Sequence, residues 1–269
     1  MLTIIRTMDP LPVAAFAFTA SDDIGANAKA LRAAVAEAGR AGAKLLLTPE
    51  CSLIGYPSAA RPDLIGVDWC RVGDEEDVLE LAARQAGLVL VLGTAGPFRD
   101  PTTFSNDALV LNAGPQPLRY RKRCLTPGDS KHFIPGDEQA CTFTVAGWTI
   151  GLTICYELRF GSVWAEQARA GVDAFATIAH MAGPDVDPGT KAAVIPALYS
   201  ARAAEWATPL LLANTAAPDR WLDSGAWDAR GLRTATLVDG VLMTTLMPRT
   251  TFAPWYAGLR DESLRRANG

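Results

Sequence analysis

The sequence predicts an α/β fold in a single domain, with helices outside and sheets inside. Stretches with the pattern of helices and stretches with the pattern of strands alternate in the first half of the chain and again after Cys155. No linker or change of composition interrupts the 269 residues. We therefore expect one domain over residues 1–269, which is long enough to bury a sizeable core.

The elements of the first half are predicted from apolar spacing and from capping residues. Leu31, Val35 and Ala38 recur at helical spacing, polar groups at 21–23 can cap that helix, and Gly42 ends it. A second helix begins with acidic residues at Asp74, where the helix dipole favours them. We expect helices over 26–41 and 74–86, strands over 11–18, 44–48 and 88–93, and an irregular segment over 58–73.

The second half reads as strands joined by turns that contain glycine and proline. Pro196 is expected to interrupt a helix over 191–207, because proline removes a backbone donor. The last residues are charged and could reach a partner subunit. The other expected elements are a helix over 162–170, strands over 106–112, 117–120, 142–145, 148–154, 172–178 and 209–213, and short strands within 222–247.

The composition resembles that of an ordinary soluble globular protein, with 49% hydrophobic and 20% charged residues and a net charge of −4. Basic residues are scattered apart from a short cluster within 119–123, so we expect no nucleic-acid partner. No apolar run reaches the ~18–20 residues that span a membrane, so we expect no membrane partner.

The N-terminal segment imitates a signal peptide, because an apolar run follows Arg6. Pro10 and Pro12 interrupt this short run, so we interpret it as the first strand. Five cysteines, an odd number in a chain too large to need disulfides, favour a reducing cytoplasm as the location. There is no CxxC pair and there are two histidines in all, so no metal site is expected.

The segment GWTIGLTICYELRF (147–160) is the first candidate for chemistry. Its apolar, β-branched run stops at Cys155, and polar and charged groups follow. A nucleophile at a strand end is held rigidly, and the next backbone N–H groups can stabilise an oxyanion. A lone cysteine in an intracellular chain is nevertheless more often a small buried hydrophobe, so the strand alone does not make Cys155 a nucleophile.

Two other reactive side chains also come just after predicted strands. Glu50 follows LLLTP, and Lys122 follows the strand that ends at Tyr120. Strand ends are where α/β folds build their sites. Taken singly, however, Glu50 would be interpreted as a solvated acid and Lys122, within Arg-Lys-Arg, as surface charge.

Together these segments resemble the nitrilase superfamily of carbon–nitrogen hydrolases along nearly the whole chain. The order and spacing of Pro-Glu, Tyr-x-Lys and Cys-Tyr-Glu make the resemblance specific. The resemblance implies a four-layer α-β-β-α sandwich and a homodimer or larger homo-oligomer. The matching segments are LLLTPECSLIGYP (45–57), YRKRCLTPGDSKHFIPGDE (120–138), GLTICYELRF (151–160), ARAAEWATPLLLANTA (201–216) and SGAWDARG (224–231).

The resemblance also implies a catalytic triad of Glu50, Lys122 and Cys155. A thiol with an ordinary pKa of about 8.5 is mostly protonated at neutral pH, and Glu50 would take its proton. The thiolate would attack an amide carbonyl, with Lys122 and the backbone N–H of Tyr156 stabilising the oxyanion. Water would then hydrolyse the thioester. The small-molecule amide and water are the expected partners, and no metal or organic cofactor is expected.

The sequence departs from the family pattern in two places. A second glutamate of the family corresponds to Asp129, whose shorter carboxylate could position the lysine or the substrate. Where relatives carry Pro-Glu after the nucleophile segment, this chain has Gly161-Ser162, and we expect Ser162 to cap the following helix. Substrate positioning could differ as a result.

Several neighbouring residues are given structural interpretations beside the functional ones. His180 follows a strand that ends near the site and is a candidate for substrate contact, although a loop histidine is more often merely part-exposed. Tyr56 and Trp148 are interpreted as packing, and Glu157 and Arg159 as a structural pair. Arg121 and Arg123 are expected to face solvent, and the remaining cysteines to be inert: Cys51, Cys70, Cys124 and Cys141.

The leading functional hypothesis is a hydrolase that cleaves the non-peptide C–N bond of a small amide. Cys-Tyr-Glu resembles the amidase-like branches, including the omega-amidase-like proteins, more than the nitrilases, in which Trp usually follows the nucleophile. N-carbamoyl amino acid hydrolysis or nitrile hydrolysis are the alternatives. A catalytically weak interaction scaffold is a different class, which the intact triad disfavours. A thiol redox or storage protein is disfavoured because no resolving cysteine lies near Cys155 in the sequence.

Overall fold

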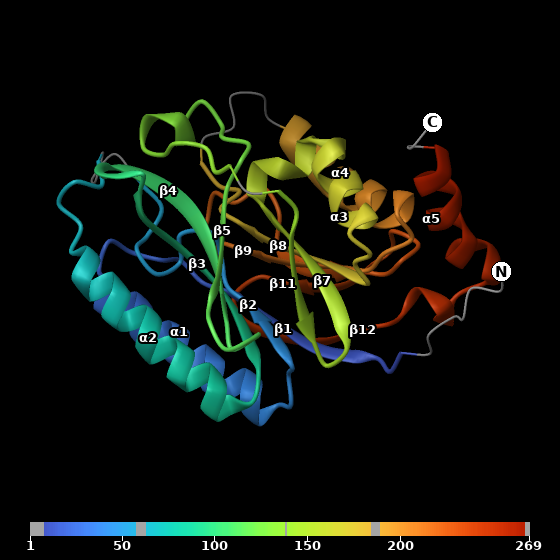
Figure 1. The fold of residues 1–269 in the computed structure, drawn as a ribbon, viewed down its shortest axis with the longest axis horizontal. Coiled ribbons are helices and arrows are strands. Elements are labelled where there is room, and N and C mark those ends of the chain that lie inside the picture. Colours follow the sequence, from blue (N-terminus) through green and yellow to red (C-terminus); the bar gives the residue numbers. More distant parts are fainter. Residues whose placement is uncertain (1–7, 58–62, 138, 184–188, 267–269) are drawn as a thin grey trace.

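The structure is a computed structural model, and it describes residues 8–57, 63–137, 139–183 and 189–266 (Figure 1). These residues contain two six-stranded sheets and five α-helices. The helices are α1 (Ile24–Arg40), α2 (Trp69–Ala86), α3 (Gly161–Arg169), α4 (Thr190–Glu205) and α5 (Pro254–Arg266). The strands of the first sheet are β1 (Leu11–Ala17), β2 (Leu45–Leu47), β3 (Val89–Phe98), β4 (Asp100–Leu111), β5 (Leu118–Arg121) and β12 (Gly240–Leu246). Those of the second sheet are β6 (Cys141–Val145), β7 (Trp148–Ile154), β8 (Ala174–Ala179), β9 (Leu210–Asn214), β10 (Ser224–Trp227) and β11 (Arg233–Leu237).

The sheets pack face to face between two layers of helices, which confirms the α-β-β-α sandwich (Figure 1). The first sheet has the order β12-β1-β2-β3-β4-β5 and is covered by α1 and α2. The second has the order β11-β10-β9-β8-β7-β6 and is covered by α3 and α4. Both sheets mix parallel and antiparallel pairs.

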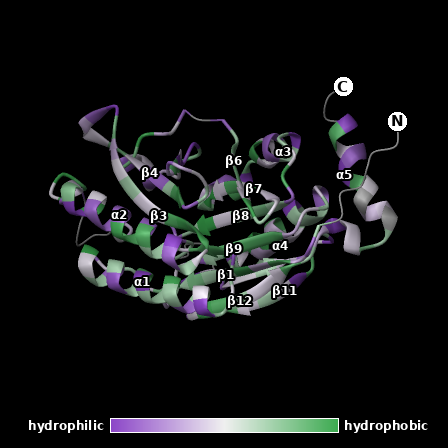
Figure 2. Cartoon of the chain, turned by 60° about the horizontal axis from the view of Figure 1, so that its bottom comes forward, coloured by the Kyte–Doolittle hydropathy of each residue, from purple (hydrophilic) through white to green (hydrophobic). Residues whose placement is uncertain are grey.

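The core follows from the two-residue period of the strands. In β1, Val13 and Ala15 belong to the apolar cluster between the sheets, whereas Ala14 and Phe16 belong to the cluster beneath α1 and α2. Such strands are buried on both faces and read as continuous apolar runs. Figure 2 shows the same distribution, with apolar residues on the central strands and hydrophilic ones on the outer helices.

Strands of the two sheets end close together, and this brings distant parts of the sequence to one place. The N–H of Glu50, three residues after β2, donates to the carbonyl of Ala179, the last residue of β8, over 3.3 Å. Cys155 directly follows β7, which pairs in parallel with β8. The loops after β2, β7 and β8 therefore meet at one edge of the sandwich.

The N-terminal turns of two helices, α2 and α3, differ in their capping or charge from the prediction. The helix α2 begins at Trp69 rather than Asp74, because Asp68 caps it by accepting the N–H of Arg71 over 3.0 Å. Its first turn holds no acidic residue, so the expected acidic start was wrong. The expected cap at Ser162 was also wrong: α3 starts at Gly161, and Ser162 lies inside its first turn.

The later elements also correct the prediction. The helix α4 runs through Pro196 without interruption, because Ile195, Tyr199 and Ala203 form a buried stripe that holds it to the sheet. The strand β3 continues five residues past its predicted end at residue 93, to Phe98, and pairs antiparallel with β4. The charged C-terminal segment forms α5, and its buried Arg260 donates to backbone carbonyl groups of α3 and the following loop. None of the helices that the structure describes is long and apolar enough to cross a membrane.

Candidate active site

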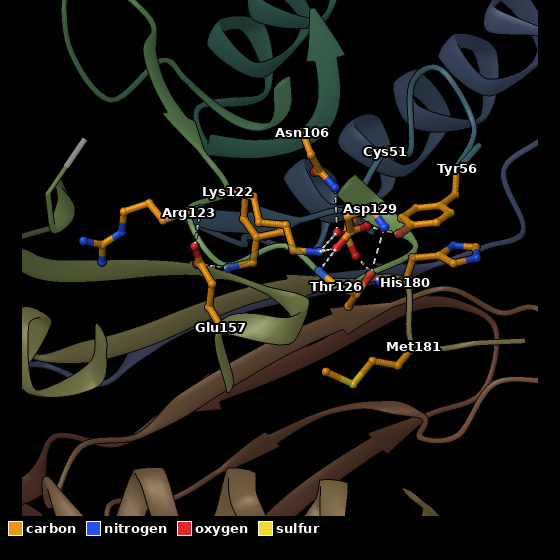
Figure 3. A network of polar contacts seen from close by, with 12 residues as sticks. Cys51, Tyr56, Asn106, Lys122, Arg123, Thr126, Asp129, Glu157, His180 and Met181 are labelled. Carbon is orange, nitrogen blue, oxygen red and sulfur yellow. Dashed lines mark hydrogen bonds and ion pairs between the residues drawn. The ribbon is translucent and has the colours of Figure 1, made fainter. Parts of the chain in front are cut away.

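Four residues with chemically reactive side chains come from separate elements and meet in one network of polar contacts, in which Figure 3 labels Lys122, Asp129 and His180. Glu50 follows β2, Lys122 follows β5, and Asp129 begins the 3-10 helix η1 (Asp129–Lys131). His180 follows β8. Lys122 is fixed through its backbone, because its N–H donates to the carbonyl of Asn106 over 2.8 Å.

Lys122 is fully buried between two carboxylates. Its Nζ lies 2.6 Å from Oε1 of Glu50 and 2.8 Å from Oδ2 of Asp129, and all three side chains have no exposed surface. Burial alone lowers the pKa of Lys122, but the neighbouring Glu50, Cys155 and Asp129 outweigh it and place that pKa well above its ordinary value. Burial likewise raises the pKa of Asp129, and Lys122 reverses this to a net lowering. The lysine is therefore an ammonium and Asp129 a carboxylate.

The carboxylate of Glu50 is held at both oxygens. The side-chain amide of Asn106 donates to Oε1 over 2.7 Å, beside the contact with Lys122. The backbone N–H of His180 donates to Oε2 over 2.8 Å. Fixed donors of this kind hold a carboxylate in one orientation.

Cys155 stands at the junction between β7 and the 3-10 helix η2 (Cys155–Arg159), with a left-handed φ of 48°. It borders a cavity of about 570 Å³ that Lys122 also lines. Burial and then the charge of Glu50 raise the pKa of the Cys155 thiol well above its ordinary value, against a lowering by Lys122. A thiol of this kind needs a base to become a nucleophile.

The cavity extends from Cys155 toward charged and apolar side chains. Tyr156 lines it, with its ring set edge-on to Phe160 at 5.3 Å. Lys191 and Trp221 also line it, and Nζ of Lys191 lies 3.5 Å from the ring centroid of Trp221. The other lining residues among those described are Tyr56, Pro57, Thr126, Leu158, Arg159, His180, Met181, Ala182, Gly183, Ile195 and Asp219.

His180 forms part of the cavity wall rather than an exposed loop. Its ring stacks on that of Tyr56, with centroids 4.4 Å apart and planes 6° apart. Burial lowers the pKa of His180, so its imidazole is neutral at neutral pH. Its backbone N–H holds Glu50, while its side chain faces the cavity.

The interpretation of Tyr56 as packing covers only its ring, which stacks on His180. Its hydroxyl donates to Oδ1 of Asp129, and its ring lines the cavity beside His180 (Figure 3). The position of Tyr56 in the segment GYP, six residues after Glu50, was the available signal. Trp148, by contrast, is buried and donates to the carbonyl of Asp9 over 3.0 Å, which confirms its structural role.

The expected pair of Glu157 and Arg159 was also wrong. Glu157 is fully buried and accepts hydrogen bonds from the Tyr120 hydroxyl and from the backbone N–H groups of Arg123 and Ile154. These bonds fix the turn that follows Cys155 to the end of β5. Arg159 is exposed and lines the cavity.

Arg121 and Arg123 do not simply face solvent as expected. The guanidinium of Arg121 lies 4.4 Å from the ring centroid of Phe98, and Arg123 forms an ion pair with Glu166 at 2.8 Å. Sequence reasoning also missed Asn106, because a strand asparagine carries no signal of its own until its partner Glu50 is known.

All five cysteines are free. Of these five, only Cys155 is among the described residues that line the cavity. Cys51 is buried beside Glu50, with its sulfur 4.0 Å from the carbonyl of Thr94, and Cys70 is exposed on α2. Within the described ranges, no group of three or more His, Cys, Asp and Glu side chains could hold a metal ion.

Comparison with known sequences identifies relatives. The family model of carbon–nitrogen hydrolases matches residues 12–246. A hydrolase of Mycobacterium tuberculosis is 28% identical over 168 residues, which are 58% of this chain and 56% of that protein. A nitrilase of Pyrococcus abyssi is 29% identical over 153 residues, which are 56% of this chain and 57% of that protein. The matches thus span little more than half the length of these curated relatives.

Comparison with solved structures gives near-complete overlap. An amidase from Nesterenkonia sp. aligns with a TM-score of 0.77 and 25% identity, over 92% of this chain and 94% of that one. A cysteine-to-alanine mutant of the amidase from Nesterenkonia sp. AN1, in complex with butyramide, aligns with a TM-score of 0.77 and 25% identity, over 95% and 96%. Another mutant of that amidase shows covalent addition of the acetamide moiety of fluoroacetamide at the active-site cysteine, and it aligns with a TM-score of 0.76 and 25% identity, over 96% of both chains.

Proposed function

The chain belongs to the carbon–nitrogen hydrolase family of the nitrilase superfamily, and from this premise we propose that it hydrolyses a small amide through a thioester on Cys155. The observation that carries the proposal is the cavity lined by both Cys155 and Lys122, with Lys122 paired at 2.6 Å to Glu50. A nucleophile, a cation and a carboxylate are the three groups that this chemistry requires.

In the first step, the amide carbonyl enters the cavity next to Cys155. The raised pKa of the thiol means that it reacts only as it gives its proton to Glu50. The sulfur then bonds to the carbonyl carbon, and the carbonyl oxygen becomes an oxyanion. The ammonium of Lys122 and the backbone N–H of Tyr156 supply the positive charge and the donor that stabilise it.

In the second step, the tetrahedral intermediate collapses and the C–N bond breaks. The departing nitrogen takes the proton from Glu50 and leaves as ammonia, and the acyl group remains on sulfur. Glu50 then accepts a proton from water, which attacks the thioester. The acid leaves, and the thiol recovers its proton from Glu50.

The Nesterenkonia amidase supports the amide as the substrate class. Its structures include complexes or adducts with butyramide and with the acetamide moiety of fluoroacetamide. The Pyrococcus nitrilase is the specific observation in favour of the second candidate, which is nitrile hydrolysis at the same cysteine. N-carbamoyl amino acids remain a third substrate class for the same triad.

Ammonia release from purified protein tests the proposal. Small amides, carbamoyl amino acids and nitriles are supplied separately, with Cys155→Ala as the blank. We expect release from at least one small amide and a loss of ~10³-fold or more in Cys155→Ala. Cys70→Ala, on the exposed surface of α2, is the matched control and should keep the wild-type rate. Turnover that persists in Cys155→Ala contradicts the mechanism, and no turnover of any class favours the scaffold hypothesis.

We also propose that the chain assembles into a homodimer or larger homo-oligomer. The resemblance to the family is the basis of this expectation, and apolar side chains exposed near α3 and α4 support it, namely Phe160 and Val194. Light scattering should give a mass at least twice the 28.6 kDa of one chain. A mass equal to one chain at micromolar concentration contradicts it.

A further inference from the structure

We propose that Tyr56 is a positioning residue of this site: its hydroxyl fixes Asp129, and through Asp129 it fixes the ammonium of Lys122. The proposal rests on the proposed function, since it assigns Tyr56 to the same reaction. The phenol lies between the cavity and the buried carboxylate, and it reaches across 73 positions of the sequence to do so (Figure 3).

The two carboxylate oxygens of Asp129 have different partners, and the phenol of Tyr56 is the partner of Oδ1. Oδ2 of Asp129 accepts from Nζ of Lys122 over 2.8 Å and from the N–H of Thr126 over 2.8 Å. Oδ1 accepts from the hydroxyl of Tyr56. With Oδ1 held, the carboxylate cannot turn about its own axis, and Oδ2 stays aimed at the lysine. An aspartate is short, so a lost partner at Oδ1 would let the group move away from Lys122.

The ring of Tyr56 also contacts His180, the residue whose backbone holds Glu50. It stacks on His180, and the backbone N–H of His180 donates to Oε2 of Glu50 over 2.8 Å. Tyr56 therefore touches the supports of both carboxylates that flank Lys122. Burial, and then the charges of Glu50 and Asp129, raise the pKa of Tyr56 above its ordinary value, so the phenol is protonated and can donate at neutral pH.

Loss of this hydroxyl has a definite electrostatic consequence. A hydrogen bond to an ionised carboxylate lowers its pKa, so removal of the donor raises the pKa of Asp129. Asp129 then becomes neutral at a higher pH than in the wild type. Once neutral, it no longer attracts the ammonium of Lys122, and the oxyanion loses a fixed cation.

Tyr56→Phe tests this, because phenylalanine keeps the ring and its stacking on His180. We expect kcat to fall about 10- to 100-fold, the effect of one charge-assisted hydrogen bond, with KM changed less than about threefold. The acidic limb of the kcat/KM profile should move to higher pH. Tyr256→Phe, in α5, is the matched control and should leave both profiles unchanged. An unchanged pH profile, or a higher KM at unchanged kcat, overturns the proposal in favour of packing or substrate contact.

A double-mutant cycle separates action through Asp129 from direct action. If Tyr56 works through Asp129, Tyr56→Phe should cost little further activity in the Asp129→Asn background. Losses that multiply in the double variant would mean that the hydroxyl acts elsewhere, and would overturn the proposal.

Alkylation of Cys155 by iodoacetamide, read by peptide mass spectrometry, distinguishes failure of this proposal from failure of the proposed function. At neutral pH the rate should fall in Tyr56→Phe and stay constant in Tyr256→Phe, because Lys122 lowers the thiol pKa. If alkylation is slower in Tyr56→Phe but the wild type turns over no amide, the proposed function is contradicted and the positioning role of Tyr56 is retained. If the wild type turns over amide but alkylation is as fast in Tyr56→Phe as in the wild type, only the positioning role is contradicted.

Discussion

At the scale of single residues, two cysteines adopt a backbone conformation that cysteine seldom takes. Cys155 and Cys51 have φ values of 48° and 53°, in the left-handed region, and each follows a strand end. Strained backbone is typical of functional sites. At Cys155 the strain turns the chain sharply into η2, so that the side chain borders the cavity at the end of β7.

The buried lysine gives a prediction about stability. Lys122→Met should lower the free energy of unfolding at pH 7 by about 3–5 kcal/mol, because it leaves Glu50 and Asp129 buried without their cation. Denaturation in urea measures this. Arg84→Met removes a surface ion pair with Glu80 and should cost less than about 1 kcal/mol.

The loss of unfolding free energy in Lys122→Met should depend on pH. In the wild type, Lys122 holds the pKa of Asp129 below its ordinary value, so this ion pair stabilises the fold above ~pH 4 and is lost as the pH falls below that value. Without Lys122, burial raises the carboxylate pKa, and protonation relieves the unpaired charge. The difference between variant and wild type should therefore shrink as the pH falls from 7 toward about 4. A difference that stays constant over this range would show that lost packing, not charge, is responsible.

The residues of the site were predictable to different degrees. The motifs of the sequence pointed to Glu50, Lys122, Cys155 and Asp129. In the structure, Lys122 is in direct contact with both Glu50 and Asp129. The hydrogen bond from Tyr56 to Asp129 was not predicted, because the family motifs single out the other site residues and the segment GYP by itself does not name a partner for the phenol.

At the scale of elements, strands were predicted better than helix ends. The strand β7 has the predicted bounds, since a buried apolar run between two turns leaves little freedom. The start of α2 was missed by five residues, because Gly73 and the acidic run after it suggested a later start than the cap at Asp68. Capping by one aspartate outweighs the weak helix propensity of one glycine.

Substitution of two aspartates tests where α2 begins. Asp68→Ala should lower the free energy of unfolding by about 1 kcal/mol, because it leaves the N–H of Arg71 without its acceptor. Asp74→Ala, exposed within the helix, should change it by less than about 0.5 kcal/mol. Urea denaturation of both variants gives the comparison. A larger loss at Asp74 would place the helix start where the sequence alone suggested.

At the scale of the whole molecule, the first and the last of the described strands lie side by side in the same sheet. The first strand, β1, pairs antiparallel with the last, β12, from Leu11 opposite Leu246 to Ala17 opposite Gly240. The second sheet, built from the middle of the chain, packs on this one through a shared apolar cluster. The sequence could suggest an α/β protein from its alternating elements, and the family resemblance implied the four-layer sandwich. The pairing of β1 with β12 was not predicted, because it is set by tertiary packing.

This arrangement leads us to propose that the chain unfolds as one domain. Thermal unfolding followed by far-ultraviolet circular dichroism and by tryptophan fluorescence should give a single, coincident transition. Trp69 lies on α2 and Trp164 on α3, so the fluorescence reports both helical layers. Two separated transitions would mean that the sheets belong to independent units.

Covalent labelling of Cys155 tests most directly the central claim that its thiol is the nucleophile, because the sulfur displaces fluoride from fluoroacetamide and forms a thioether. The protein is incubated with fluoroacetamide and digested, and each cysteine peptide is weighed by mass spectrometry, with Cys155→Ala and Cys70→Ala in parallel. We predict one acetamide group on the peptide that contains Cys155 in the wild type and in Cys70→Ala, together with loss of amide turnover in proportion to labelling. Amide turnover that survives complete labelling of Cys155, or labelling of another cysteine that alone abolishes turnover, would contradict the mechanism.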